Sequence, residues 1–291
     1  MKWAFFISLP LLSTFKVITQ GFFSRGKIKT LADSIKFNGL MFLFAAVSLI
    51  IFNVRQLPSV ETILYALALA LLSLGFQTFY VLSFKTGAVS LSSTISAFSA
   101  VIPIIFSIIV YQETIGLFKY LGFALMAVAI VLMPSSKKDG DPKKGIKTSK
   151  KWFLFITITA ICSGVATIVQ QVFSKSAVAN EKDLFTAITF IFAFIFSLIL
   201  LPIIKGKQPL FKIDKKVGIG VIFCGLALGF YNLLVVIALS LIPASEFLPT
   251  NTGLIILTTV SLSSLVFKEV PSIKQILGII LAIVAVVFIN L

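Results

Sequence analysis

Two charged side chains fall within stretches of sequence that are otherwise apolar. Lys16 interrupts the apolar run that begins at Trp3, and Glu246 follows Pro243 near the start of another run. Charges are costly in such surroundings, so both residues are candidate binding sites. Lys16 could pair with an anionic ligand group or a carboxylate, or its alkyl chain could carry the charge to an interface. Glu246 could exchange a proton or bind a cation, or it could satisfy the N-terminal amides of a helix.

A second group of candidates consists of uncharged polar residues within the apolar stretches. Serines from Ser90 to Ser99 precede Pro103, and Thr250, Asn251 and Thr252 follow Pro249. A proline removes a backbone donor and can free a carbonyl for a ligand. We expect these stretches to line a pathway, although small polar residues also allow tight helix packing. The predicted pathway set is Lys16, Gln20, Gln77, Tyr80, Ser92, Thr94, Ser96, Gln170, Tyr231, Asn232, Glu246, Thr250 and Asn251.

Other chemistries lack the residues that they need. The chain has no histidine, and its two cysteines, Cys162 and Cys224, lie in apolar segments without metal-ligand spacing. We therefore expect buried or lipid-facing thiols, no metal and no cofactor. An intramembrane enzyme would need convergent nucleophiles, acids or metals, so we expect no catalytic residues and no enzyme.

The elements that position these residues are predicted to be membrane-spanning helices. The 291 residues are 58% hydrophobic and 12% charged, with a mean hydropathy of +1.10. The apolar runs lack the alternation of a β-barrel, so helices must satisfy the backbone in lipid. The sequence thus predicts an all-α membrane protein with ten spans, at 3–23, 35–54, 61–84, 88–111, 118–133, 152–173, 184–204, 217–241, 244–267 and 273–291.

The two halves of the chain resemble each other. A Lys-rich linker, residues 135–151, separates a half at 1–134 from a half at 152–291. Matching residues recur at a constant offset in the first helix of each half, as Ser13 with Ser163 and Gln20 with Gln170 show, and Gly75 matches Gly229 in the third helix. We interpret the halves as repeats of five helices each. Because five is odd, the repeats are expected to be inverted, as in alternating-access transporters.

Each half ends in a similar motif. Glu113 is followed by Gly122, and Glu269 is followed at the same spacing by Gly278. These segments resemble the drug/metabolite transporter superfamily, in particular its EamA-type ten-helix members. The resemblance implies transport of a small metabolite, amino acid or drug. We expect a structural role for Glu113, Gly122, Glu269 and Gly278.

The charges indicate an orientation but no nucleic-acid partner. The net charge is +15, and most Lys and Arg residues fall in alternate loops, including the central linker. The positive-inside rule places these loops in the cytoplasm and both termini outside, whereas the family resemblance implies termini inside. We expect a multi-pass protein of the cell membrane, surrounded by the lipid bilayer. The predicted function is secondary active transport of a small-molecule substrate, with protons as one candidate coupling ion. The alternatives are a passive channel, a lipid-handling protein or a membrane scaffold.

Overall fold

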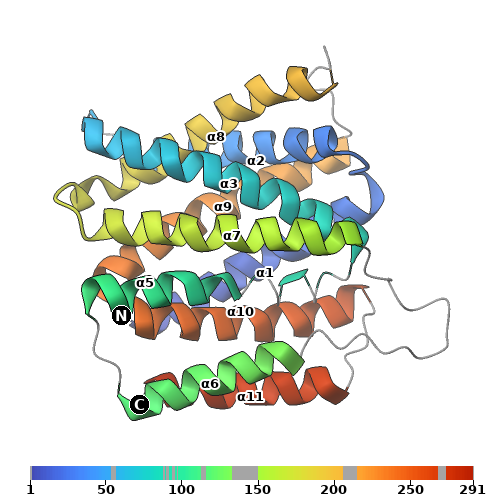
Figure 1. The fold of residues 1–291 in the computed structure, drawn as a ribbon. Coiled ribbons are helices and arrows are strands. Elements are labelled where there is room, and N and C mark those ends of the chain that lie inside the picture. The colour runs from blue at the N-terminus through green and yellow to red at the C-terminus, as the bar shows by residue number, and fades with distance from the viewer. Residues whose placement is uncertain are drawn as a thin grey trace, which may run out of the picture.

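A computed structural model of the chain describes residues 2–53, 57–87, 89, 92–93, 96, 98–112, 116–132, 150–205, 215–267 and 273–290. Helices make up the regular structure of these residues (Figure 1). In the first half they are α1 (Lys2–Gly26), α2 (Leu31–Asn53), α3 (Val60–Thr86), η1 (Phe98–Ala100), α5 (Val101–Tyr111) and α6 (Leu117–Leu132). In the second half they are α7 (Lys150–Ser174), η2 (Ala179–Glu181), α8 (Lys182–Lys205), α9 (Lys215–Leu241), α10 (Ala244–Phe267) and α11 (Ile273–Asn290).

The observed helices follow the predicted spans closely, with one difference. Seven helices of the described residues are long and apolar enough to cross a membrane, and three shorter apolar helices accompany them. The predicted number of ten spans therefore stays a prediction. The span predicted over 88–111 has a 3-10 turn, η1, directly before α5 instead of one continuous α-helix. Pro103 lies in the first turn of α5, where its missing N–H costs no helical hydrogen bond.

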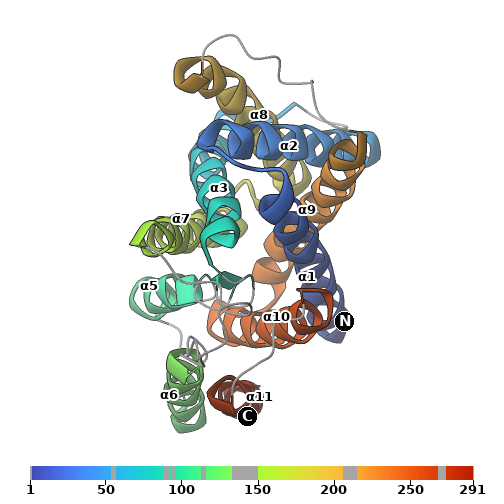
Figure 2. The same cartoon turned by 90° about the vertical axis from the view of Figure 1, so that its right-hand side faces the viewer.

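The helix contacts between the halves occur in pairs that are related by exchange of the two halves. Helix α1 packs against α9, and its repeat mate α7 packs against α3. The same exchange relates α2–α9 to α8–α3, and α1–α10 to α7–α5. Two further contacts, α2–α8 and α6–α11, join a helix to its own mate. These three pairs of contacts are thus related by exchange of the halves, as a two-fold relation between repeats requires (Figure 2).

Large apolar side chains and small residues fill the interface near this axis. The rings of Phe42 from α2 and Phe190 from α8 stack with their centroids 6.0 Å apart. Helix α9 approaches α2 through Gly225 and Gly229, which lie one helical turn apart against Met41 and Ala45. This approach leaves no room for a side chain on α9, so α2 and α9 form a tight contact between the halves.

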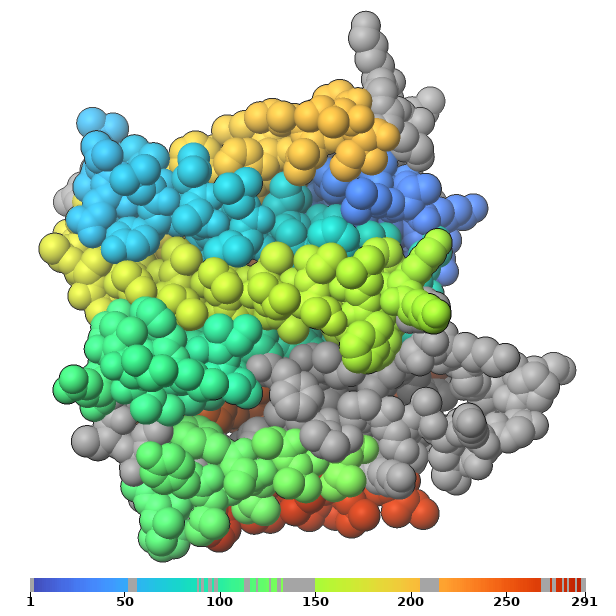
Figure 3. Space-filling model, in the orientation of Figure 1, coloured from blue at the N-terminus to red at the C-terminus, as the bar shows by residue number. Residues whose placement is uncertain are grey.

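The outer surface is apolar, as a lipid-facing surface should be. Exposed side chains include Leu117, Phe118 and Leu121 of α6, and Ile276 and Ile280 of α11. These two helices pack on each other and form the lower margin of the molecule in Figure 3. The chain is therefore a multi-pass membrane protein.

The two ends of the helices differ in charge. The described basic residues of the predicted cytoplasmic loops lie near the end of the molecule opposite both termini (Figure 1). Lys85, at the end of α3, donates a hydrogen bond from Nζ to the Lys29 carbonyl at 2.6 Å, which joins two of these loops. The charge pattern of the sequence thus corresponds to one basic end in space.

Candidate substrate cavity

A cavity of about 160 Å³ lies between the two halves. Its walls come from α1, α2, α3 and the η1 region of the first half, and from α7, α8, α9 and α10 of the second. Ser13 and Ser163 are repeat mates, as are their helices α1 and α7, and both line it. The cavity therefore lies across the two-fold relation of the halves, where the sequence predicted a pathway.

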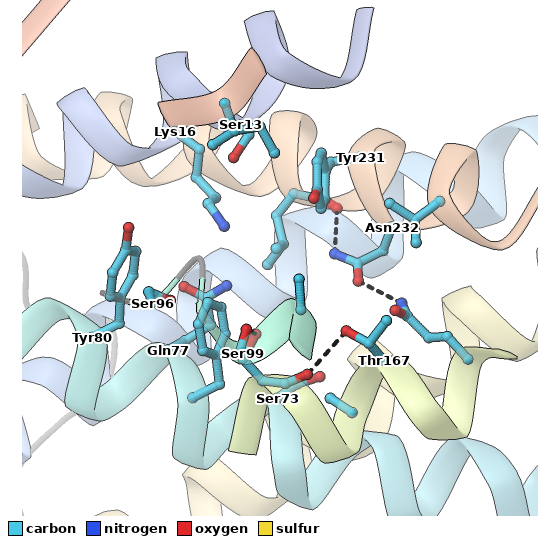
Figure 4. Close-up of a pocket in the computed structure, with 18 of the residues that line it drawn as sticks. Ser13, Lys16, Ser73, Gln77, Tyr80, Ser96, Ser99, Thr167, Tyr231 and Asn232 are labelled. Carbon is cyan, nitrogen blue, oxygen red and sulfur yellow. Dashed lines mark hydrogen bonds between the residues drawn. The ribbon is translucent and has the colours of Figure 1, made fainter. Parts of the chain in front are cut away.

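Lys16 provides the cationic group of this cavity. Its side chain is only 4% exposed, and its ammonium points into the cavity (Figure 4). Nζ lies 5.7 Å from the centroid of the Phe76 ring and 5.8 Å from that of Tyr231. Aromatic faces attract a cation, so these two rings hold the ammonium at the wall. Lys16 is the one charged residue among the described residues that line the cavity. Its repeat mate in the second half is the neutral Ala166.

Each half presents an amide pair that joins its first and third helices. In the first half, Gln20 Nε2 donates to Gln77 Oε1 at 3.0 Å. In the second half, Gln170 Nε2 donates to Asn232 Oδ1 at 2.9 Å. The donors Gln20 and Gln170 are repeat mates, whereas the acceptors Gln77 and Asn232 lie one position apart in the repeat, so the two contacts are similar but not identical. Gln77, Gln170 and Asn232 line the cavity, whereas Gln20 lies fully buried behind Gln77 and orients its amide.

Hydroxyl groups complete the polar wall. Ser99 Oγ lies 2.9 Å from Ser163 Oγ, which connects η1 to α7. Tyr80 and Ser96 line the first-half side, and Asn251 lines the second-half side with Nδ2 3.5 Å from the Tyr231 hydroxyl. The Asn251 amide oxygen is buried and has no hydrogen-bond partner among the described residues. An unpaired buried acceptor is costly, so a ligand donor that reached this oxygen would relieve that cost.

Apolar clusters lie on both sides of the cavity along the helix axes. Toward the basic end, Val17, Phe84 and Trp152 pack together. Toward the ends that carry the termini, Phe6, Leu239 and Phe247 belong to another cluster. Both clusters combine residues from the two halves. The polar cavity is thus bounded at each end by apolar contacts that relative movement of the halves would change.

Besides Gln20, three described residues of the predicted set lie outside the cavity wall. Ser92 accepts a hydrogen bond from Trp152 Nε1 at 2.9 Å, so it belongs to the basic-end cluster. Thr250 faces its own helix and donates to the Glu246 carbonyl at 2.8 Å. Glu246 is half-buried in the first turn of α10, where its backbone N–H donates to the Pro243 carbonyl. This place fits an acid at a helix N-terminus, and its ion-coupling role stays a prediction.

The remaining predicted residues either lie outside the described part of the chain or are not part of the cavity wall. Thr94, Glu113, Glu269 and nearly all of the 135–151 linker lie outside the described residues. Gly122 and Gly278 are buried in α6 and α11, the two mates that pack on each other. Helix α10 continues through Pro249, so the helix remains regular there.

Sequence reasoning missed part of the wall. Ser73, Thr167 and Phe76 line the cavity but were not in the predicted set. Ser13 and Ser163 carried a usable signal, because they are polar residues at matched repeat positions. The apolar lining residues carried none, since a phenylalanine facing the cavity and one facing lipid look alike in a sequence with 30 phenylalanines.

Fold and cavity together define a helical membrane protein of two repeats with a polar chamber between them. The sequence model of the EamA-like transporter family matches residues 2–134 and 150–291. The chain therefore belongs to the EamA-like transporter family, whose members are membrane transporters of small molecules. A solved structure titled "Crystal structure of protein" has a TM-score of 0.70 at 13% sequence identity, with 98% of this chain and 98% of that chain covered. This likeness supports the fold. The comparison with curated proteins gave no match.

Proposed function

We propose that the chain is a secondary transporter that carries a small metabolite across the cytoplasmic membrane by alternating access. The observation that supports this proposal most directly is the polar cavity, which is lined by both halves and lies across their two-fold relation. In inverted-repeat transporters the substrate binds between the repeats, near the middle of the membrane. The residues proposed to contact substrate are those of the predicted set that line the cavity, namely Lys16, Gln77, Tyr80, Ser96, Gln170, Tyr231, Asn232 and Asn251.

The two apolar clusters are the proposed gates. The basic-end gate joins Phe84 of the first half to Trp152 of the second, and the opposite gate joins Phe6 to Phe247, whose rings stack with centroids 6.2 Å apart. Rocking of one half against the other would separate one cluster and compress the other. In an inverted repeat, exchanging the conformations of the two halves converts a state that is open on one side into a state that is open on the other.

The proposed orientation places the basic end in the cytoplasm. Short loops rich in Lys and Arg stay on the cytoplasmic side, and here these loops share one end of the molecule. Both termini would then lie outside. The driving force would be an ion gradient, with protons as the candidate ion, or the gradient of the substrate itself. Tags at the two termini, tested with protease in intact cells, distinguish this orientation from the reverse.

Solute counterflow in proteoliposomes tests the proposed function. Vesicles are loaded with an unlabelled solute, and uptake of a trace of the same labelled solute is followed across a panel of acids, amines, amino acids and nucleosides. A transporter accumulates label transiently and saturably, because the loaded solute returns the carrier. Passive equilibration without overshoot for every solute that enters would indicate a channel. Movement of labelled lipid alone would indicate a lipid-handling protein.

A further inference from the structure

We infer that the cavity selects a small hydroxycarboxylate of net charge −1, with its carboxylate paired to Lys16 and its hydroxyl donating to Asn251. The inference rests on the proposed function, and it adds the chemical class of the substrate. Two independent features carry it: a buried cation in a wall without an acid, and a buried acceptor without a donor.

The charge of the cavity argues for an anion. Lys16 is 4% exposed, and no Asp or Glu is among the described residues that line the cavity. A buried charge is costly unless it is paired. The rings of Phe76 and Tyr231 reduce this cost without neutralising the ammonium. A ligand of charge −1 completes the pair, whereas a zwitterion leaves the cavity with the same net charge as before, and a cation adds to it.

The number of cationic groups separates carboxylates from phosphates. A phosphate monoester carries a charge of about −1.5 to −2 near neutral pH, and arginine or several cations usually bind it. The described wall offers one lysine, its other polar side chains carry hydroxyl or amide groups, and the remaining lining is apolar. One ammonium balances one carboxylate, so the carboxylate is the better match. The volume of about 160 Å³ lies below the roughly 300–1,000 Å³ of pockets for drug-sized ligands, which favours a short carbon chain.

The buried oxygen of Asn251 indicates which chemical group the other end of the ligand carries. Asn251 Oδ1 is buried and unpartnered, while Asn251 Nδ2 lies 3.5 Å from the Tyr231 hydroxyl. The ring of the same Tyr231 lies near the Lys16 ammonium, so the cation and the acceptor both belong to residues that contact one aromatic side chain. A ligand that spans them needs an anionic group at one end and a donor at the other. A hydroxyl supplies the donor without adding a positive charge.

Four ligands built on one three-carbon skeleton separate these requirements. L-lactate has the carboxylate and the hydroxyl, L-lactamide has no charge, L-alanine is zwitterionic, and pyruvate has no donor. Binding of each is measured on the purified protein by displacement of labelled L-lactate, and glycolate and glycerate cover neighbouring sizes. We expect the hydroxy acids to bind most tightly and L-lactamide about 10- to 100-fold more weakly, since it loses a charge-assisted hydrogen bond.

Variants identify the groups responsible. Lys16→Gln should bind L-lactate about 10- to 100-fold more weakly and lose the preference over L-lactamide, whereas Lys16→Arg keeps the preference. Lys215→Gln removes an exposed lysine at the start of α9 and should leave it unchanged. Asn251→Leu should reduce the preference of L-lactate over pyruvate.

The comparison of ligands on the unaltered protein does not depend on whether a variant folds. Equal affinity for L-lactate, L-lactamide and L-alanine overturns the inference. So does unchanged selectivity in Lys16→Gln, or failure of every hydroxy acid to bind while another solute shows counterflow. In that last case the proposed function stands, whereas the absence of counterflow for all solutes refutes the proposed function itself.

Discussion

The close contact between α2 and α9 predicts how much stability the protein loses when a methyl group is added there. A Cβ atom added at Gly225 would lie 2.6 Å from the Met41 carbonyl oxygen and 2.7 Å from Phe44 Cβ. Ordinary contacts begin at 3.4 Å, so the helices must separate by about 0.8 Å locally. The Met41 oxygen belongs to the backbone of α2, so no side-chain rotation relieves the clash. Overpacking of this kind costs about 1–3 kcal/mol.

The matched control is Gly218→Ala on the same helix. A Cβ at Gly218 meets nothing within 4 Å, so this variant shows only the general effect of alanine on a helix, a gain of about 0.5–1 kcal/mol. That gain is common to both variants and cancels in their comparison. Gly225→Ala should therefore be about 1–3 kcal/mol less stable than Gly218→Ala.

Thermal unfolding in detergent, followed by tryptophan fluorescence, measures the difference. With about 2–4 °C for each kcal/mol in a chain of this size class, the midpoint of Gly225→Ala should lie about 2–12 °C below that of Gly218→Ala. Gly229→Ala, whose Cβ would lie 3.0 Å from Ser48 Oγ, should fall between them. Equal midpoints for Gly225→Ala and Gly218→Ala would refute the tight α2–α9 contact.

Three further predictions concern the ends of the helices. A Cβ at Gly87 would overlap Nε1 of the Trp152 indole, so Gly87→Ala should displace this indole and shift its fluorescence to the red in a Trp3→Phe background. An unshifted spectrum would contradict the basic-end cluster. Ser59 donates to Glu181 Oε2 from its backbone N–H at 2.9 Å, so Glu181→Gln should speed amide exchange at the start of α3; unchanged exchange there would contradict this contact. Glu246 lies at the N-terminus of α10, so Glu246→Gln should lower the stability of the protein by about 0.3–1 kcal/mol. The same variant should keep pH-driven flux. Loss of that flux with intact counterflow would instead assign the ion-coupling role to Glu246.

The fold could be predicted in large part because lipid imposes a simple pattern. Seven predicted spans reappear as long helices, with ends that differ by a few residues. The region before α5 was harder, since Ser92, Ser96 and Ser99 are compatible with a helix, a turn or a cavity wall. Only the packing of η1 against α7 decides between them, and such packing depends on residues far apart in the sequence.

The site could be predicted where polarity and repeat symmetry coincide. Gln170 and Asn232 entered the predicted set because polar groups within spans are uncommon, and both line the cavity, whereas Gln20, the mate of Gln170, lies behind Gln77. The orientation of a side chain was not available from the pattern. Thr250 and Asn251 are neighbours on α10, yet only Asn251 lines the cavity, because successive residues of a helix point in different directions.

The central claim is that the cavity opens to one side of the membrane at a time. Thr167, which lines the cavity from α7, is replaced by cysteine in a protein whose Cys162 and Cys224 have been removed. Membrane-impermeant thiol reagents are then applied from each side of oriented vesicles, with and without a solute that shows counterflow. Alternating access predicts labelling from either side, with the solute raising one rate while it lowers the other. Rates that rise or fall together on both sides, or labelling accompanied by a continuous ion conductance, would contradict the account.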